Sequence, residues 1–298
     1  MNKTILCLTF LLSGSCAFAQ KKATIINHET REYVSYVNIW VENENTGTTS
    51  NESGEFELNI DGPKNRLVSA IAYESAKINA DSINEFVELK PLPIELSEVV
   101  VEAKRKTQYL IIGKFKKSTI NEYFGCDATP WIVARYFEYK EAYSKTPFLS
   151  HIKVLTDSDV KDAKFNVRLY GMNEKGEPEG YIYAENIIGV AKTGNRITEI
   201  DISDLGIKFP ENGFFIAFEW LIIESNKYEF ESTMPGSKKK HNLITYEPSF
   251  GSVPSDAEAN SWIFTHGKWT RTSKNNKAAN NRYRNKYNLI AIELTLTN

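Results

Sequence analysis

Histidine, the side chain that most often acts in catalysis and metal binding, occurs four times in this chain of 298 residues. Its histidines begin none of the H-x-x-E, H-x-H or H-E-x-x-H patterns that hold a catalytic metal. They are His28, His151, His241 and His266. No G-x-S-x-G elbow or G-x-x-x-x-G-K-S/T phosphate loop occurs either. We therefore predict a protein that is not an enzyme and binds no cofactor. The remaining enzymatic alternative is a glycan hydrolase whose carboxylates meet only in the fold.

Carboxylates gather in two short segments and could begin a calcium site, which needs six to eight oxygen ligands. Neither segment has the residue order of an EF-hand loop or of a calcium-binding nonapeptide repeat. The second also contains Gly176, Pro178 and Gly180, which are typical of a solvated hairpin loop. We predict no metal site and keep calcium as the alternative at both segments. These are Asp157, Asp159 and Asp162 in the first, and Glu174, Glu177 and Glu179 in the second.

Basic residues gather in two segments of the C-terminal half. Between residues 268 and 286 there are seven basic residues and no acidic one, and a second basic turn covers residues 238–240. Two such loops at one end of a β-sandwich would attract phosphate groups of lipopolysaccharide or an acidic glycan. Solvated loops that only aid solubility are the alternative. The candidate anion-binding residues are Lys238, Lys239, Lys240, Arg271, Lys274, Lys277, Arg282 and Arg284.

Two tryptophans near the longer basic segment could bind sugars. Glycan-binding sandwiches stack sugar rings on exposed aromatic faces, and Trp262 and Trp269 are candidates for this role. Packing in the core is the alternative for both. Trp131 and Trp220 occur in alternating apolar segments, and we expect both to lie in the core.

The elements that must position these residues are β-strands. Hydrophobic residues make up 41% of the chain and charged residues 25%, which is ordinary for a folded protein. A formal net charge of −2 does not favour binding to nucleic acid. From residue 126 onward, apolar runs separated by polar turns predict a larger, jelly-roll-like β-sandwich over 126–298. The predicted strands are 131–137, 148–155, 165–170, 197–202, 214–223, 261–265 and 287–296.

The N-terminal part of the chain predicts a smaller sandwich over 20–102. Short alternating segments follow one another closely, with the hairpin signal at residues 43–47 between two of them. A basic stretch, residues 103–125, then reads as a linker with a short helix at 107–112. The predicted strands of the small sandwich are 24–27, 37–41, 56–60, 66–73 and 86–89.

Residues 47–56 read Gly-Thr-Thr-Ser-Asn-Glu-Ser-Gly-Glu-Phe. This segment resembles the G-T-x-T-D-x-x-G-x-F pattern of carboxypeptidase regulatory-like domains. Ala72-Tyr73, then Val-Glu-Leu-Lys-Pro at 87–91 and Leu-Ser-Glu-Val-Val-Val at 96–101, are similar to the family's closing elements. The resemblance implies a transthyretin-like, seven-stranded sandwich without catalytic residues. The last element is often found where such a domain precedes a TonB-dependent outer-membrane receptor.

The segment departs from the family pattern at several positions. Tyr33 stands where the family often has proline, and Ala72 stands where it often has glycine. Ser50 and Asn51 replace the usual threonine and aspartate. Because glycine and proline determine turn shape, we expect a loop here to differ from that of the family.

The first 19 residues read as a secretory signal peptide. Lys3 precedes an apolar run, and Ala17-Phe18-Ala19 has the small-residue order of a cleavage site. A lipid anchor on Cys16 is the alternative. Cleavage would leave Cys126 as the lone cysteine, which we expect to be a buried apolar residue, although a disulfide-linked dimer stays open. We also expect no transmembrane helix in the mature chain, because it contains no apolar run of about 20 residues.

These expectations together describe an exported, all-β, non-enzymatic protein of the cell envelope. We expect it in the periplasm, at the outer membrane or on the cell surface, as a binding or adhesion module for glycan or another envelope component. The alternative is a scaffold or accessory partner of a TonB-dependent outer-membrane transporter. Which ligand is bound, on which side of the outer membrane, and in which oligomeric state are questions for the folded protein.

Overall fold

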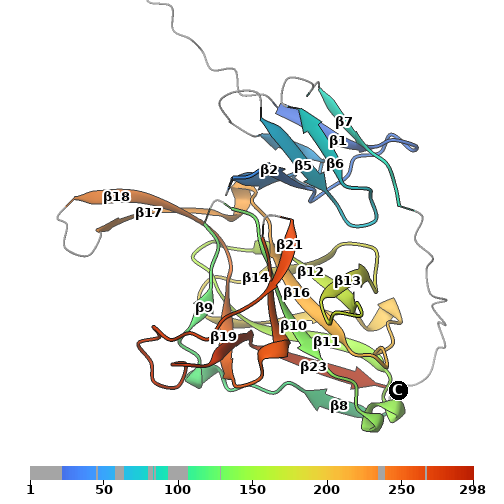
Figure 1. Cartoon of the computed structure of the whole chain (residues 1–298), viewed down its shortest axis with the longest axis vertical. Coiled ribbons are helices and arrows are strands. Elements are labelled where there is room, and N and C mark those ends of the chain that lie inside the picture. The colour runs from blue at the N-terminus through green and yellow to red at the C-terminus, as the bar shows by residue number, and fades with distance from the viewer. Residues whose placement is uncertain are drawn as a thin grey trace, which may run out of the picture.

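The computed structural model describes residues 22–44, 46–57, 64–79, 83, 85–92, 107–127, 129–233, 239–265 and 267–298 (Figure 1). The proposed signal peptide, Lys238, His266 and the segment 96–101 lie outside these residues. The regular elements of the described residues are strands and short 3-10 helices, which confirms the predicted all-β class. In this part of the chain no helix is long and apolar enough to cross a membrane.

The small N-terminal domain is a sandwich of two sheets. One has the strand order β4-β1-β7 and the other β3-β2-β5-β6. Apolar side chains from alternate positions of both sheets, including Ile25, Ile39 and Leu89, fill the space between them. The strands are β1 (Lys22–Asn27), β2 (Asn38–Val41), β3 (Gly47–Thr49), β4 (Glu55–Glu57), β5 (Asn65–Ser69), β6 (Ala76–Asn79) and β7 (Phe86–Leu89).

The large domain is a second sandwich, built from two larger sheets. The first has the order β13-β12-β16-β10-β20-β21 with β14 added to β12. The second has the order β22-β19-β11-β23-β8, with β15 added to β11 and β9 to β19. The strands are β8 (Tyr109–Ile112), β9 (Tyr123–Phe124), β10 (Ile132–Phe137), β11 (Phe148–Asp157), β12 (Ala163–Met172), β13 (Pro178–Tyr181), β14 (Ile187–Ala191), β15 (Arg196–Asp201), β16 (Phe214–Trp220), β19 (Ser249–Ser255), β20 (Ser261–Thr265), β21 (Lys268–Arg271), β22 (Tyr287–Ile290) and β23 (Ile292–Thr297).

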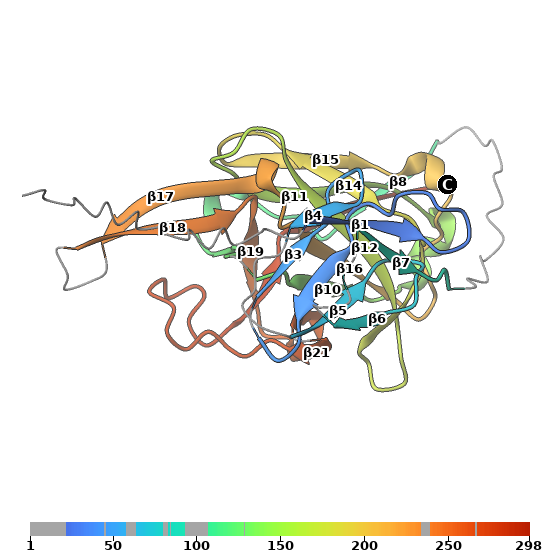
Figure 2. The same ribbon diagram turned by 90° about the horizontal axis from the view of Figure 1, so that it is seen from above.

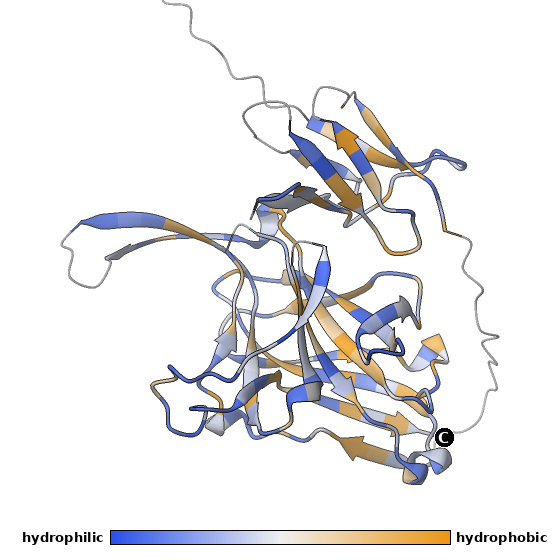
Figure 3. Ribbon diagram, viewed as in Figure 1, coloured by the Kyte–Doolittle hydropathy of each residue, from blue (hydrophilic) through white to orange (hydrophobic). Residues whose placement is uncertain are grey.

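The 3-10 turns lie between strands of the large domain. They are Lys117–Thr119, Glu141–Lys145, Ser203–Leu205, Glu224–Asn226 and Glu258–Asn260. The aromatic core between the two large sheets contains Phe165, Phe218 and Phe250, whose rings contact one another with centroids 4.9–5.5 Å apart. Figure 3 shows hydrophobic residues along the strands that enclose this core, among them β16 and β23.

The expected linker is partly a structural element of the large domain. Residues 109–112 form β8, which pairs with β23, so the predicted short helix at this position is wrong. Residues 123–124 form β9 and pair with β19. The pattern Tyr-Leu-Ile-Ile has no helical period, and the unpaired edge of β23 makes strand formation the better way to satisfy its backbone groups.

One feature of the fold stands apart from both sandwiches. Strands β17 (Lys227–Thr233) and β18 (Lys240–Tyr246) form a two-stranded sheet of their own. Figures 1 and 2 show this hairpin as an arm that projects away from the body. We refer to it below as the β17–β18 arm.

The small domain packs on the large one through β2 and β3. The Thr49 amide donates a hydrogen bond to the Ile222 carbonyl at 3.2 Å, and the Ile222 amide donates to Thr49 Oγ1 at 3.0 Å. The rings of Trp40 and Phe264 meet edge to face with centroids 6.4 Å apart. A Cβ on Gly47 would lie 2.9 Å from Pro130 of the large domain, so the two backbones approach closely at that point.

Candidate functional site

The long basic loop between β21 and β22 is a packed structure. The Tyr283 side chain is fully buried, and its hydroxyl donates to the Ser252 carbonyl at 2.9 Å. Arg282 donates to the Thr119 carbonyl, and Arg284 Nε donates to the Ala278 carbonyl at 3.2 Å. These two candidate anion-binding arginines therefore bind the chain itself and hold the loop in shape.

Other cations of the same loop also have partners. The Arg271 guanidinium lies 5.0 Å from the centroid of the Trp262 ring, and Lys274 Nζ lies 5.7 Å from that of Tyr287. Lys286 forms an ion pair with Asp256. The Lys277 side chain is exposed. The charge of this loop predicted a ligand-binding surface, but most of its cationic side chains contact other residues of the same protein.

The second basic segment is not beside the first. Lys239 and Lys240 lie at the end of the β17–β18 arm, where Lys240 Nζ pairs with Glu231 Oε2 at 2.6 Å. Figures 1 and 2 show the arm and the basic loop as separate projections. Lys239 and Lys240 thus belong to the arm and do not combine with the β21–β22 loop into one basic surface, and Lys238 lies outside the described residues.

The two candidate sugar-stacking tryptophans differ in exposure. Trp262 retains only 3% of its surface, so its burial argues against a stacking role and favours the core alternative. Trp269 is half-buried and packs edge to face on Tyr170 with centroids 5.3 Å apart. Trp220 is fully buried, as expected, and stacks on Trp131 at 4.5 Å.

The acidic segments do not assemble a metal centre. Among the described residues, no three His, Cys, Asp or Glu side chains lie close enough together to hold an ion. The carboxylate of Asp157 instead accepts a hydrogen bond from Asn195 at 3.4 Å, and that of Glu177 accepts one from Asn173 at 3.3 Å. These contacts order two turns.

Two buried titratable groups lie near the start of β19 and the turn before β10. Burial, together with the nearby carboxylates of Asp159 and Asp157, raises the pKa of Glu247 to about 7. Cys126 is buried, and this burial raises the pKa of its thiol. A buried, protonated thiol is a poor nucleophile, which fits the expectation of an apolar packing role.

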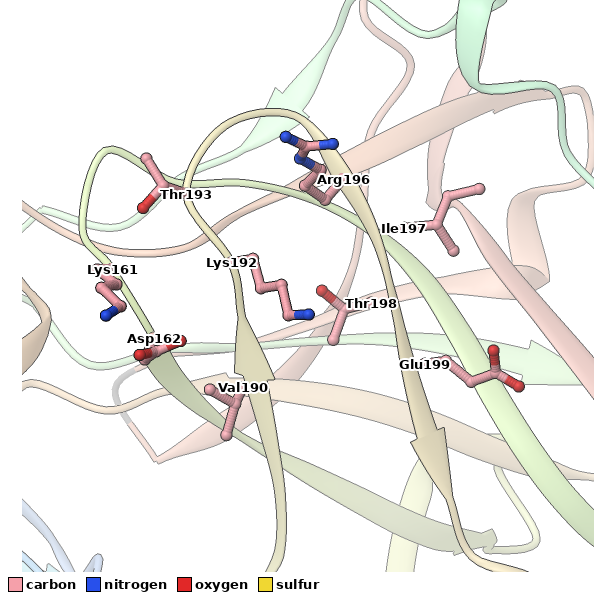
Figure 4. A pocket seen from close by; sticks show the side chains of 9 residues that line it. All are labelled: Lys161, Asp162, Val190, Lys192, Thr193, Arg196, Ile197, Thr198 and Glu199. Atoms are coloured by element: carbon pink, nitrogen blue, oxygen red, sulfur yellow. The ribbon is translucent and has the colours of Figure 1, made fainter.

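A groove between β14 and β15 is the strongest candidate for a binding site. It has a volume of about 780 Å³ and lies where the two large sheets present neighbouring edges (Figure 4). Strand β14 pairs with β12 of one sheet and β15 pairs with β11 of the other, so no ladder closes the space between them. The groove is lined by Lys161, Asp162, Val190, Lys192, Thr193, Arg196, Ile197, Thr198 and Glu199.

The cations of this groove are not neutralised by the protein. Within the described part of the chain, the side chains of Lys161, Lys192 and Arg196 form no ion pair or hydrogen bond. Of the two carboxylates at the groove, that of Glu199 forms an ion pair with Lys153, whose Nζ lies 3.9 Å from Glu199 Oε2. Three exposed cations against two carboxylates leave the groove with a net positive charge.

The shape of the groove depends on two tight turns. Asp162 has a φ of +55° where the chain enters β12, and Gly194 has a φ of +80° between Lys192 and Arg196. Glycine adopts this left-handed conformation without steric cost. The Gly194 turn connects Lys192, which directly follows β14, with Arg196, the first residue of β15. The hydroxyl of Thr198 lies 2.8 Å from that of Thr156. Sequence reasoning missed this site because its cations are isolated in the sequence.

Known proteins resemble parts of this chain. Among solved structures, the cysteine protease and lectin-like domains of Cwp84, a surface layer associated protein of Clostridium difficile, are 13% identical, with a TM-score of 0.34 over 57% of this chain and 33% of theirs. The Clostridial cysteine protease Cwp84 after propeptide cleavage is 12% identical, with a TM-score of 0.37 over 65% of this chain and 41% of its own. This chain thus spans less than half the length of either Cwp84 structure.

A structure of infectious bursal disease virus, Gx strain, is 8% identical, with a TM-score of 0.22 over 89% of this chain and 56% of its own. No curated protein matches the sequence. Residues 22–101 match the family model of the CarboxypepD_reg-like domain, which agrees in position with the resemblance seen at residues 47–56 and 87–101. The N-terminal sandwich is therefore a CarboxypepD_reg-like domain, whose family model matches residues 22–101.

Proposed function

We propose that this protein is an exported, non-enzymatic component of the bacterial cell envelope that binds an acidic glycan in the β14–β15 groove. The observation that carries the proposal is the set of three unpaired cations, Lys161, Lys192 and Arg196, around one open groove. Unpaired cations in a concave site raise the local concentration of anionic ligands and hold them by charge-assisted hydrogen bonds.

The other groove residues favour a sugar over a simple anion. Asp162 and Glu199 would repel inorganic phosphate, but their oxygens accept hydrogen bonds from sugar hydroxyls. Val190 and Ile197 are 43% and 50% exposed, and apolar side chains at such positions pack against the C–H faces of a sugar ring. Carboxylates, cations and apolar surface together match a glycan that carries carboxylate or sulfate groups.

The proposed location rests on the N-terminal part of the chain. Residues 1–19 have the order of a signal peptide, and a CarboxypepD_reg-like domain follows them. In this proposal the small domain positions the large one at the envelope, and the contacts of Thr49 with Ile222 and of Trp40 with Phe264 keep the groove in a fixed orientation.

A second candidate is a scaffold for an outer-membrane transporter of the TonB-dependent type. It is favoured by the segment Leu-Ser-Glu-Val-Val-Val at 96–101, which resembles the sequence that often precedes such receptors. Co-purification with an outer-membrane barrel after cross-linking in intact cells supports this candidate. If the protein purifies without such a barrel and binds a glycan, the glycan-binding function is supported instead.

The role of the groove in binding is tested by removing two of its positive charges. A control variant loses two positive charges outside the groove. We expect Lys192→Ser with Arg196→Ser to weaken binding of a uronic-acid oligosaccharide at least about tenfold, because each charge-assisted hydrogen bond contributes about 1.5–3 kcal/mol. The matched control is Lys274→Ser with Lys277→Ser in the basic loop, which removes the same charge and should leave the affinity within about twofold.

Isothermal titration calorimetry at about 0.15 M salt measures both variants, since exposed charges further apart than about 8 Å are then largely screened. The affinity for a neutral oligosaccharide of the same length shows whether binding requires the acid groups of the sugar. Equal losses in the two double variants contradict the groove as the site. Absence of binding to carboxylated and sulfated oligosaccharides alike contradicts the proposed function itself.

A further inference from the structure

The β17–β18 arm has two long, free strand edges. Its strands pair with each other over seven residues each, from Lys227 opposite Tyr246 to Thr233 opposite Lys240. Among the described residues, neither strand pairs with a third one. An isolated two-stranded hairpin is at best marginally stable in water, and a free edge is a template for pairing with another chain.

The backbone groups on the free edge of β18 can be assigned from one hydrogen bond. The Tyr246 amide donates at 2.8 Å to the carbonyl of Cys126, which lies outside the arm, so this amide points away from β17. Backbone direction alternates along a strand, and the register of the arm has no bulge. Ile244, Asn242 and Lys240 therefore also direct their N–H and C=O groups outward, and no described residue binds them.

The two edges differ in charge pattern. On β17 the outward groups belong to Lys227, Glu229, Glu231 and Thr233, which are the cross-strand partners of the outward residues of β18. Pairing the middle of β17 with a second copy of itself about a two-fold axis places glutamates opposite each other. Like charges in directly opposite positions destabilise a ladder.

The β18 edge meets no such obstacle. A two-fold axis at Asn242 places this residue opposite itself and Lys240 opposite Ile244 of the second copy. No pair of like charges results. The arrangement uses the three outward residues with free backbone groups and stops before Tyr246, whose amide is already bound. It also covers Leu243 and Ile244, whose side chains are 39% and 40% exposed.

We propose that two copies of this chain associate through the β18 edges of their arms. The strands run antiparallel about a two-fold axis at Asn242 and make a four-stranded sheet between the two bodies. This self-complementary contact is isologous and closes at the dimer. It involves neither the groove nor its ligand, so it stands or falls independently of the proposed function.

A single cysteine at the axis tests the register. Directly opposite residues of a hydrogen-bonded antiparallel pair have Cα atoms about 5.5 Å apart, within the range of a disulfide. We expect Asn242→Cys to form a disulfide-linked dimer on mild oxidation of the purified protein. Glu231→Cys is the matched control, because Glu231 is the cross-strand partner of Asn242 but lies on the opposite edge. It should remain monomeric on a non-reducing gel, and equal cross-linking of both variants overturns the proposal.

Sedimentation velocity tests the association without cross-linking. We expect a dimer for the unmodified protein and a monomer for Ile244→Pro, because proline removes an outward N–H from an edge strand. Glu229→Pro removes the outward N–H of the partner position on β17 and should leave the dimer intact. A monomeric unmodified protein, or loss of the dimer in both proline variants, overturns the proposal.

Discussion

The side-chain amide of Asn38 in the small domain donates a hydrogen bond to Glu219 Oε1 in the large domain, and the two residues are 181 positions apart in the chain. Glu219 also accepts from Arg168 Nε at 2.9 Å and forms an ion pair with its Nη2 at 2.8 Å. The side chains of Arg168 and Glu219 are each 3% exposed. A buried ion pair of the large sheet thus has one of its acceptors satisfied by the CarboxypepD_reg-like domain.

This contact predicts that the two domains stabilise each other. Asn38→Ala leaves Glu219 Oε1 without its donor, and an unsatisfied buried group costs about 1–3 kcal/mol. We expect the free energy of unfolding, measured by urea titration, to fall by that amount. Lys64→Ala is the control, since it removes an exposed ion pair with Glu44 and should cost less than about 1 kcal/mol. A similar effect of both changes would contradict the proposed coupling.

Gly189 provides a test of how tightly the aromatic core is packed. It lies opposite Phe165 in the ladder, and a Cβ at this position would come within 2.2–2.7 Å of the Phe165 ring. Phe165 is fully buried and cannot move without disturbing Phe250. We expect Gly189→Ala to destabilise the protein by about 1–3 kcal/mol in thermal or urea unfolding. Gly125→Ala, where the nearest atom is the Ser249 hydroxyl at 3.3 Å, should have a much smaller effect.

Ala72 carries backbone strain at the position where the family often has glycine. Its φ is +65°, and the left-handed region costs an L-residue about 1–2 kcal/mol. Glycine removes that strain but adds entropy to the unfolded chain, worth about 0.4–1 kcal/mol. We therefore expect Ala72→Gly to raise stability by up to about 1 kcal/mol. Ala76→Gly, within β6, should instead lower the stability, because Ala76 has no such strain to relieve. A stabilising effect of Ala76→Gly would contradict strain relief as the cause of any gain at Ala72.

Glu247 predicts a dependence of stability on pH. Its pKa is raised by burial from the ordinary value of 4.5 to about 7, so the folded state retains a proton that the unfolded state has lost. This contribution to stability is fully present below pH 4.5 and is lost as the pH rises towards 7. At 1.36 kcal/mol per pH unit, the loss amounts to about 3 kcal/mol.

Urea unfolding at several pH values measures this effect in the unmodified protein and in Glu247→Gln. The neutral amide does not titrate, so the variant should lack the part of the pH dependence that lies between pH 4.5 and 7. Identical pH profiles for the two proteins would show that Glu247 is ionised in the fold across that interval.

Several properties could be inferred from the sequence because they depend on local patterns. Alternation of apolar and polar residues predicted strands such as 131–137 and 148–155, which the fold contains as β10 and β11 with shifted ends. The turn residues at 47–56 and the closing elements at 87–101 identified the small domain, and the family match confirms it. The Tyr-Leu-Ile-Ile segment was misread because its strand conformation depends on the distant edge of β23.

The candidate site and the interfaces were decided only by tertiary structure. Lys192 and Arg196 line one groove because β14 and β15, which are neighbours in sequence, join different sheets, a choice that sequence spacing does not encode, and Lys161 lines it from the segment before β12. The positive charge of the basic loop was visible in the sequence. The contacts of Arg271 with the Trp262 ring and of Arg282 with the Thr119 carbonyl were not. The hydrogen bond between Asn38 and Glu219 likewise depends on which faces of the two domains are in contact. Strand periodicity is a property of neighbouring residues, whereas a binding site is a property of surfaces that folding brings together.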